Sequence, residues 1–312
     1  MDRDSPDRSG VFTPATRSGV FFCGLGQVVE IIRSPQDMQD QALKWRTAGQ
    51  RIVLVPTMGF FHQGHLSLME YGRTVGDRLV VSLFVNPTQF GPNEDLEQYP
   101  RDEARDCELA RQVGVDVLFA PEPQSMYPPG YQTYVTVEQL TQGLCGAFRP
   151  THFRGVTTVV LKLFNLVQPH IAVFGEKDYQ QLVTIQRMVV DLNLPLAVVG
   201  RPIVREPDGL AMSSRNRYLT LEERQSALCL YKAGRGAQEL VANGEVRRDR
   251  LMATVSQMLN HSPGTVVDYV SLVEPSTLAE VDIIQGAARL AMAVRIGRTR
   301  LIDNFLLEES RS

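Results

Sequence analysis

The stretch VLVPTMGFFHQGHLSL (residues 53–68) decides which fold this sequence predicts. It begins within an apolar, largely β-branched run from Ile52 to Val55, which is typical of a buried parallel strand. A short turn with one proline and two glycines comes next, and the apolar residues from Leu66 onward begin a helical pattern. A strand, a glycine-containing turn and a helix in this order direct free backbone N–H groups at an anion.

Two histidines, His62 and His65, lie at the predicted entrance of this helix. Their spacing of three residues would place both on one helix face. A neutral imidazole can donate a hydrogen bond to phosphate, and a protonated one adds charge. The stretch therefore predicts a triphosphate site with a mobile positive charge. Two histidines near a turn are more often structural or solvated, so this interpretation needs support from the rest of the chain.

Length and composition limit the function classes. The 312 residues are enough for two domains, and 43% hydrophobic with 21% charged residues suits a soluble globular protein. The formal net charge of −3 gives no basic field for nucleic acid. The four cysteines form no C-x-x-C pair, which argues against a cysteine zinc site and fits a reduced, cytoplasmic setting. No apolar run approaches the roughly 20 residues of a membrane span, so no membrane partner is expected.

The N-terminal residues 1–25 are rich in Asp, Arg, Ser, Pro and Gly and show little periodicity. We expect a disordered, mobile tail there, without a convincing signal peptide. The alternative is that translation begins further in.

Residues 26–203 alternate between strand and helix patterns, which predicts a doubly wound parallel sheet of the α/β class. A small accessory strand is expected at 134–137. The main strands are expected at 28–32, 52–56, 78–85, 115–119, 171–174 and 196–199, and the helices at 34–45, 66–76, 102–113, 156–166 and 180–192.

The pattern changes at residue 204, where a smaller α+β domain (204–312) is predicted. Thr220 and Glu223 fit the capping box of a helix that runs to about Asn243. A further helix is expected at 247–259, and antiparallel strands at 266–273, 290–296 and 299–306.

Polar pairs directly follow three of the predicted strands. Ligands of open α/β sheets bind outside the carboxyl ends of the strands. Three polar pairs at this edge indicate a site more strongly than any one of them. The pairs are His62 with His65, Asn86 with Gln89, and Lys177 with Asp178.

Six motifs, occurring in one order, point to a known family. They are VPTMG with HxGH (55–65), FVNPxQF (84–90), HFRGV (152–156), FGEKDYQQ (174–181), MSSRN (212–216) and RLIDN (300–304). With these motifs the chain resembles the pantoate–β-alanine ligases, or pantothenate synthetases, over roughly residues 28–307. The resemblance implies a Rossmann-like domain with a smaller lid-like C-terminal domain, usually in a homodimer. It also implies ATP-dependent ligation of (R)-pantoate and β-alanine to pantothenate, with AMP and diphosphate as products, a pantoyl adenylate intermediate and Mg²⁺.

The resemblance assigns roles to single residues. His65 would be the proton donor, within a catalytic set that also holds His62, Lys177, Ser213, Ser214 and Arg215. Pantoate would lie at Gln89 and Gln181, with β-alanine also near Gln89. Asp106 matches a position sometimes assigned to metal. ATP would be contacted by Met58, Gly59, Phe60, Phe61, His62, Gln63, Gly64, His65, Gly175, Glu176, Lys177, Asp178, Val204, Met212, Ser213, Ser214 and Arg215.

Three residues depart from the family pattern without removing a group that does chemistry. Phe60 and Phe61 replace a commoner pair of a small residue and Leu, and Gln63 stands where an acidic residue is frequent. Phe61 is expected to reshape the pocket wall.

The chemistry explains why such residues are needed. A carboxylate and an amine at neutral pH form a salt, so the carboxylate must first be activated by ATP. The protein then acts by positioning and by stabilising charge on the departing diphosphate. We expect the loop 205–217 to close with the second domain, because an acyl adenylate must be kept from water.

Several residues have simpler explanations. Asp178 is equally well explained as a cap of the following helix. Gln180 reads as a solvated helix residue, and Arg154 as the structural partner of an acid. Asp303 and Asn304 are expected to fix a turn or strand end, and His152, His170 and His261 to be structural or surface residues.

Two rival functions remain open. One is adenylyl or cytidylyl transfer to a phosphate on the same fold, against which Gln89 and Gln181 favour a carboxylate substrate. The other is a non-catalytic nucleotide-binding protein, which would be expected to have lost His65, Lys177 or Arg215, and all three are present.

Overall fold

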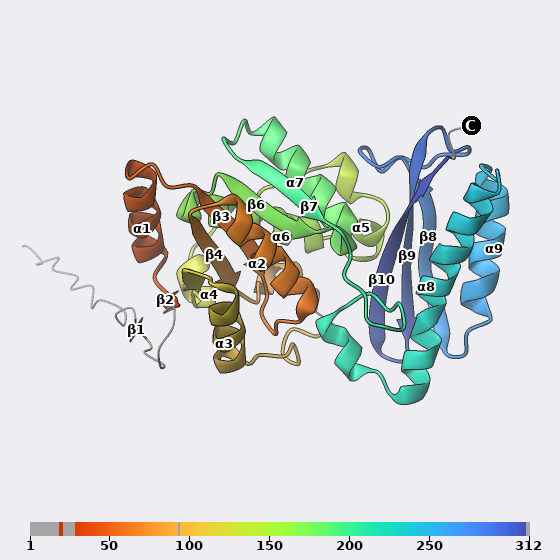
Figure 1. Ribbon diagram of the computed structural model, residues 1–312, viewed down its shortest axis with the longest axis horizontal. Coiled ribbons are helices and arrows are strands. Elements are labelled where there is room, and N and C mark those ends of the chain that lie inside the picture. Colours follow the sequence, from red (N-terminus) through yellow and green to blue (C-terminus); the bar gives the residue numbers. More distant parts are fainter. Residues whose placement is uncertain (1–18, 21–28, 93, 310–312) are drawn as a thin grey trace, which may run out of the picture.

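The computed structural model describes residues 19–20, 29–92 and 94–309, which form two units side by side (Figure 1). Of the expected tail at 1–25, only Gly19–Val20 is described, as the two-residue strand β1. The remainder of that prediction lies outside the described residues. Among the described helices, none combines the length and the apolar character needed to cross a bilayer.

The first unit is built on a seven-stranded sheet in the order β1-β2-β5-β4-β3-β6-β7. The strands β2 to β7 pair in parallel, and β1 pairs antiparallel with β2. The chain winds outward from β3 in both directions, which confirms the doubly wound parallel sheet. The strands are β2 (Glu30–Ile32), β3 (Ile52–Thr57), β4 (Arg78–Leu83), β5 (Val117–Phe119), β6 (Ile171–Gly175) and β7 (Ala197–Arg201).

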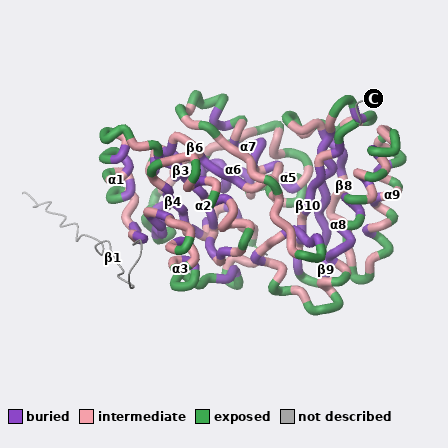
Figure 2. Tube along the Cα trace, in the orientation of Figure 1, coloured by how far each residue is buried: buried purple, intermediate pink, exposed green. Residues whose placement is uncertain are grey.

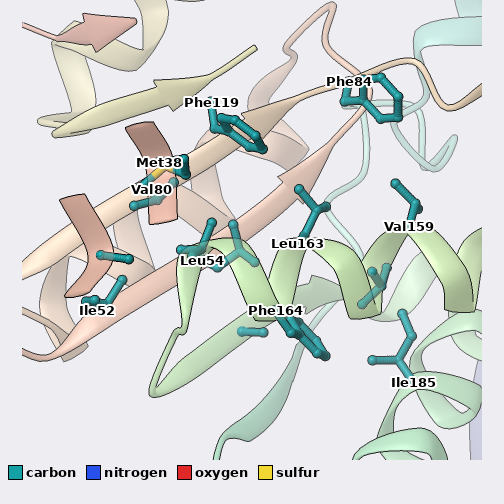
Figure 3. Close-up of a cluster of buried hydrophobic side chains, with 14 of the residues drawn as sticks. Met38, Ile52, Leu54, Val80, Phe84, Phe119, Val159, Leu163, Phe164 and Ile185 are labelled. Carbon is teal, nitrogen blue, oxygen red and sulfur yellow. The ribbon is translucent and has the colours of Figure 1, made fainter. Parts of the chain in front are cut away.

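Both faces of this sheet are covered, which explains the unbroken apolar run in β3. Leu54 packs into a core formed with α1, α6 and α7 (Figure 3), whereas Val53 and Val55 pack into a second core with α2 and α3. The helices are α1 (Pro35–Thr47), α2 (Gln63–Val75), α3 (Glu103–Val113), α6 (His152–Val167) and α7 (Tyr179–Asp191), with the short α4 (Pro123–Met126) and α5 (Cys145–Phe148) between them.

The second unit is a three-stranded antiparallel sheet backed by two helices. The strands are β8 (Thr265–Val273), β9 (Ala287–Ile296) and β10 (Thr299–Glu308), in the order β10-β9-β8. Helices α8 (Leu221–Ala242) and α9 (Arg248–Asn260) share a core with the sheet. Helix α8 begins at the capping box of Thr220 and Glu223, as predicted. Figure 2 shows the buried residues gathered in the interior of each unit.

Two sequence predictions differ from the structure in ways that matter for the site. The accessory strand expected at 134–137 is absent, because the backbone of Val135 bonds to Thr157 and Thr158 of α6 and not to a strand. Helix α6 begins at His152, four residues before the expected start at Val156, so His152 lies in its first turn.

Candidate functional site

The segments that follow β3, β4 and β6 meet at the carboxyl edge of the sheet, as the strand order requires. They surround a cavity of about 240 Å³. The three polar pairs singled out in the sequence all line it, together with Gln181 of α7. The segment after β7 adds five residues to the lining, namely Val204, Met212, Ser213, Ser214 and Arg215.

The two histidines are fixed at the start of α2 by a reciprocal cap. The Gly64 N–H donates to Nδ1 of His62 (3.1 Å), and the His62 N–H donates to Nδ1 of His65 (3.3 Å). Their rings lie against each other, with centroids 4.0 Å apart. Because each Nδ1 accepts a backbone hydrogen bond, a neutral ring carries its proton on Nε2. Each imidazole can therefore donate one hydrogen bond to a ligand.

Both imidazoles are neutral in the free protein. Burial, followed by the charge of Lys177, lowers the pKa of His62 from 6.5 to about 4. Burial, His62 and Lys177 together lower the pKa of His65 well below its usual value. The sequence suggested a mobile positive charge here, whereas the free site presents two neutral donors beside the Lys177 cation. An anion in the cavity would oppose these shifts, since it favours protonation.

The turn before the histidines is held by a carboxylate from another helix. The buried Asp106 of α3 accepts hydrogen bonds from the N–H groups of Phe60 (2.6 Å) and Phe61 (2.7 Å). Phe60 has a φ of 54°, in the left-handed region that non-glycine residues rarely adopt. Asp106 thus stabilises a costly backbone conformation that aims α2 at the cavity.

Four residues of the predicted ATP-contacting stretch do not line the cavity: Gly59, Phe60, Phe61 and Gln63. The side chain of Phe61 is completely buried in the core under α2. The expectation that Phe61 would reshape the pocket wall is therefore wrong. Phe60 lies beneath the guanidinium groups of Arg105 and Arg217.

The geometry gives no support to a protein-held metal. Within the described part of the chain, no group of three or more His, Cys, Asp and Glu side chains could hold an ion. Both oxygens of Asp106 already accept backbone hydrogen bonds, which accounts for this residue without a metal.

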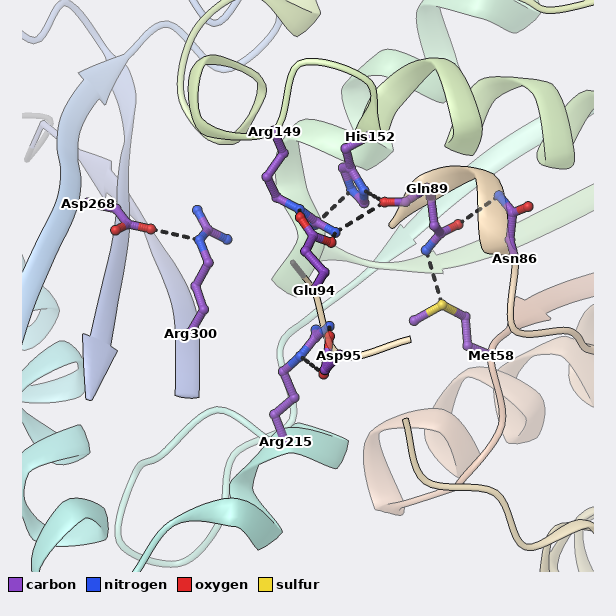
Figure 4. A network of polar contacts seen from close by, with 10 residues as sticks. All are labelled: Met58, Asn86, Gln89, Glu94, Asp95, Arg149, His152, Arg215, Asp268 and Arg300. Carbon is purple, nitrogen blue, oxygen red and sulfur yellow. Dashed lines mark hydrogen bonds and ion pairs between the residues drawn. The ribbon is translucent and has the colours of Figure 1, made fainter. Parts of the chain in front are cut away.

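Gln89 is oriented by its neighbours on the segment after β4 (Figure 4). Its Oε1 accepts from Nδ2 of Asn86 (3.1 Å), and its Nε2 lies 3.0 Å from Sδ of Met58. Its backbone carbonyl contacts Nδ1 of His152 (2.9 Å) and accepts from Arg149 (3.2 Å). The amide is thereby held at the cavity wall in one orientation.

Sequence reasoning missed Arg149 and His152 as site residues. Both line the cavity, and Arg149 forms a two-point ion pair with Glu94. The HFRGV motif contained the signal for His152, but the helix was predicted to begin too late for that residue to be placed. Nothing in the local sequence marked Arg149, because its partner lies 55 residues away.

The segment after β6 turns its residues in different directions. Lys177 and Asp178 both line the cavity, and Nζ of Lys177 lies 3.8 Å from the Asp178 carboxylate. Asp178 precedes α7 but makes no side-chain capping hydrogen bond, so the capping alternative is wrong. Glu176 points away from the cavity to Arg289 of the second unit (3.6 Å).

The MSSRN motif joins the two units at the cavity. Oγ of Ser213 accepts from the Arg215 N–H (3.3 Å), and Oγ of Ser214 donates to the Phe60 carbonyl (3.4 Å). The guanidinium of Arg215 is occupied by a bidentate pair with Asp95 (2.8 and 2.9 Å). The expected phosphate-binding fork is therefore already engaged by a carboxylate in this structure.

Three other residues differ from their sequence interpretation. Gln180 is buried and holds the 140–145 segment, with its amide donating to the carbonyls of Leu140 and Gly143 (both 2.9 Å). Arg154 lies over the Tyr134 ring, 4.4 Å from its centre, and forms no ion pair with an acid among the residues that the structure describes. Asn304 reaches across to the first unit, where it donates to the carbonyls of Glu176 and Lys177.

A larger cavity of about 1020 Å³ between the two units opens beside the first. Both cavities share Arg149, His152, Lys177, Asp178, Gln181, Ser213 and Arg215. Figure 4 shows Arg300 of β10 opposite Arg149 across this space. The arrangement can hold an extended anion, because neutral donors, a lysine and two glutamine amides line one continuous space.

Comparison with known proteins gives one consistent result. The family model described as pantoate-beta-alanine ligase matches residues 30–306. The pantothenate synthetase of Syntrophotalea carbinolica is 57% identical over 282 residues, which are 90% of this chain and 100% of that protein. The one from Geobacter sulfurreducens is 56% identical over 283 residues, with 91% and 100% covered.

Comparison with solved structures points to the same family as the sequence comparison. A crystal structure of pantothenate synthetase from Thermus thermophilus has a TM-score of 0.84 at 44% identity and covers 88% of this chain and 98% of that one. A pantoate-beta-alanine ligase from Francisella tularensis, complexed with beta-gamma ATP and beta-alanine, has a TM-score of 0.72 at 32% identity, with 88% and 97% covered.

Proposed function

The chain belongs to the pantoate–β-alanine ligase family. We propose that the protein uses ATP to join (R)-pantoate and β-alanine in the smaller of the two cavities. One observation supports this assignment of the site above all. Two neutral imidazole donors, Lys177 and the amides of Gln89 and Gln181 line one cavity of about 240 Å³. That set suits a phosphate chain lying next to a hydroxylated carboxylate.

The first step activates the carboxylate. A pantoate carboxylate oxygen attacks the α-phosphorus of ATP, the bond from that phosphorus to the bridging oxygen breaks, and diphosphate leaves. Gln89 and Gln181 hold pantoate through donors and acceptors that match its hydroxyls and carboxylate. Because Asn86 and Met58 fix the Gln89 amide, little ordering remains to be done when pantoate binds.

Charge then grows on the departing diphosphate. His62 and His65 donate through Nε2, and Lys177 adds a full positive charge. The neutral His65 ring has no acidic proton to transfer, so we give it the role of a hydrogen-bond donor to the departing diphosphate oxygen through Nε2. Losing one such donor typically costs about 3–4 kcal/mol of barrier, or on the order of 10²–10³ in rate.

The second step forms the amide. The neutral amine of β-alanine attacks the acyl carbon of pantoyl adenylate, the bond to the AMP oxygen breaks, and the amine loses a proton to water. No covalent enzyme intermediate is needed. The loop 205–217 and the second unit cover the cavity while the adenylate exists, and their closure is part of the proposal.

Mg²⁺ enters this scheme as part of the substrate Mg·ATP. The described residues offer no cluster of three or more metal-ligating acids, histidines or cysteines. The ion then takes its ligands mainly from phosphate oxygens and water, as Mg²⁺ commonly does. A homodimer is proposed from the family resemblance, and light scattering after size-exclusion chromatography tests it.

Product analysis tests the proposed function. The protein is incubated with Mg·ATP and (R)-pantoate, with and without β-alanine, and AMP and pantothenate are followed by mass spectrometry. Pantothenate that forms only with both substrates supports the proposal. A nucleotide-linked product with a phosphate acceptor would favour the adenylyl- or cytidylyl-transfer alternative. ATP binding without turnover would favour a non-catalytic protein.

A further inference from the structure

The RLIDN motif at 300–304 has no role in the chemistry described so far, although two of its residues are almost completely buried. Asp303 is 2% exposed and Asn304 is 4% exposed, on neighbouring positions of β10. Neighbouring residues of a strand point to opposite faces of the sheet. Each of the two can therefore reach a different segment of the first unit or of the junction.

Asn304 contacts the segment that carries Lys177. Its Nδ2 donates to the carbonyls of Glu176 (2.9 Å) and Lys177 (3.0 Å). Its Oδ1 accepts from Nη1 of Arg289 (3.0 Å). Two carbonyls require a donor and a guanidinium requires an acceptor, so only an amide side chain satisfies all three partners.

Arg289 strengthens the same contact. Its guanidinium lies 3.6 Å from the Glu176 carboxylate and 3.9 Å from the centre of the Tyr179 ring. The 176–179 segment is thus held from the second unit at its backbone and at two side chains.

Asp303 contacts the other segment that faces the nucleotide. Its carboxylate forms a bidentate pair with Arg205 (2.7 and 2.9 Å), whose Nη1 also donates to the Gly209 carbonyl (3.0 Å). The Met212 N–H in turn donates to the Val204 carbonyl (3.0 Å), which closes this segment into a tight loop.

We propose that Asp303 and Asn304 form a clamp that sets the 175–178 and 204–212 segments at the spacing that binds the nucleotide. Neither residue touches the reacting atoms, so both are positioning residues. The clamp is the point at which closure of the second unit is transmitted to Lys177. It rests on the proposed function in one respect only, namely that the nucleotide is ATP.

The test measures Mg·ATP binding by calorimetry without pantoate, so it needs no turnover. Asn304→Ala removes two hydrogen bonds to the Lys177 segment and should weaken binding roughly 5- to 100-fold. Arg205→Lys loses the bidentate fork and tests the other arm, independently of whether Asn304→Ala folds. Gln238→Ala is the matched control, because Gln238 donates to the Leu306 carbonyl of β10 (3.0 Å) within the second unit. It should bind Mg·ATP within about twofold of the wild type.

A double-mutant cycle separates positioning from general destabilisation. If Asn304 acts through Lys177, Asn304→Ala should add little to the loss of binding caused by Lys177→Ala. In turnover, the clamp variants should raise the KM for ATP and leave the KM for pantoate within about twofold.

Unchanged Mg·ATP binding in Asn304→Ala and Arg205→Lys, or full additivity with Lys177→Ala, would overturn the clamp. A wild-type protein that binds Mg·ATP but makes no pantothenate would instead refute the proposed function and leave the clamp standing.

Discussion

Replacing Gly155 with alanine tests how closely α6 must approach the segment that carries Gln89. A Cβ at Gly155 would lie 2.4 Å from the Thr88 carbonyl oxygen and 2.7 Å from Cα of Gln89. Ordinary contacts begin at 3.4 Å, so the two backbones would have to separate by about 1 Å. Asn86 also donates to the Gly155 carbonyl (3.1 Å), so the Asn86–Gln89 contact would shift with it.

The change in unfolding free energy caused by Gly155→Ala is the balance of two opposing effects. Alanine in place of glycine inside a helix gains up to about 1 kcal/mol from propensity. Overpacking against rigid backbone typically costs about 1–3 kcal/mol, so a net loss of unfolding free energy is expected. A misplacement of about 1 Å at a substrate-positioning residue can cost on the order of 10²-fold in rate. We therefore expect a lower kcat/KM for pantoate, with the KM for ATP nearly unchanged.

The assay combines steady-state AMP formation at varied pantoate with thermal unfolding. Gly143→Ala is the control, because a Cβ there meets no atom within 4 Å. It should keep both parameters close to the wild type. A Gly155→Ala protein with unaltered kcat/KM for pantoate and an unchanged Tm would show that α6 need not approach the Gln89 segment this closely.

Four further predictions follow from the same geometry. Burial lowers the pKa of His62 from 6.5 to about 4, so the unfolded chain binds more protons than the folded protein between these pH values. The unfolding free energy should therefore fall by up to about 3 kcal/mol as the pH drops from 6.5 to 4. Denaturant unfolding at several pH values should show a smaller pH dependence in His62→Gln. Asp106→Asn replaces one of the two oxygen acceptors with a donor that faces the N–H groups of Phe60 and Phe61. The substitution should lower the unfolding free energy by about 1–3 kcal/mol and raise the KM for ATP. A variant that melts like the wild type would contradict the role of Asp106 in holding this turn. Gln180→Ala removes the hydrogen bonds to Leu140, Gly143 and Cys145. The unfolding free energy should fall by about 1–3 kcal/mol, and protease should cleave the 140–145 segment faster than in the wild type. An unchanged rate of proteolysis would contradict the role of Gln180 in holding this segment. Chelating Mg²⁺ should leave the Tm of the free protein unchanged, since no cluster of metal ligands exists in its described part. When ATP is present, chelation should lower the Tm. A shift of the Tm without ATP would reveal an ion held by the protein.

The sequence predicted those features that depend on local pattern. The unbroken apolar run from Ile52 to Val55 predicted a strand buried on both faces, and the two cores on either side of β3 account for it. The placement of His62, Gln89 and Lys177 at one sheet edge followed from counting strands, because the carboxyl ends of parallel strands meet there.

The features that the sequence did not predict depend on partners far apart in the chain. The guanidinium of Arg215 was expected to bind phosphate, but it is paired with Asp95, which lies 120 residues away in the sequence. Asp106 lies 46 residues from the Phe60 N–H that it accepts. The neutral state of the histidines depends on burial and on Lys177, neither of which a local motif reveals.

Val135 shows the limit of pattern reasoning in a different way. Its β-branched, alternating surroundings predicted a strand at 134–137. In the structure its N–H and carbonyl are bonded to Thr158 and Thr157 of α6. A period of two indicates an extended backbone with one packed face, and it does not show that another strand supplies the hydrogen bonds.

His65 and Lys177 are proposed to promote attack of pantoate on ATP, and exchange of labelled diphosphate into ATP measures this step in isolation. We expect exchange in the wild type that requires pantoate but not β-alanine, and a fall on the order of 10²–10³ in His65→Ala and in Lys177→Ala. His170→Ala is the control, because His170 bonds to the Ile52 N–H (3.0 Å) at the opposite end of β3. Exchange that needs no pantoate, or that survives unchanged in both variants, would contradict the account.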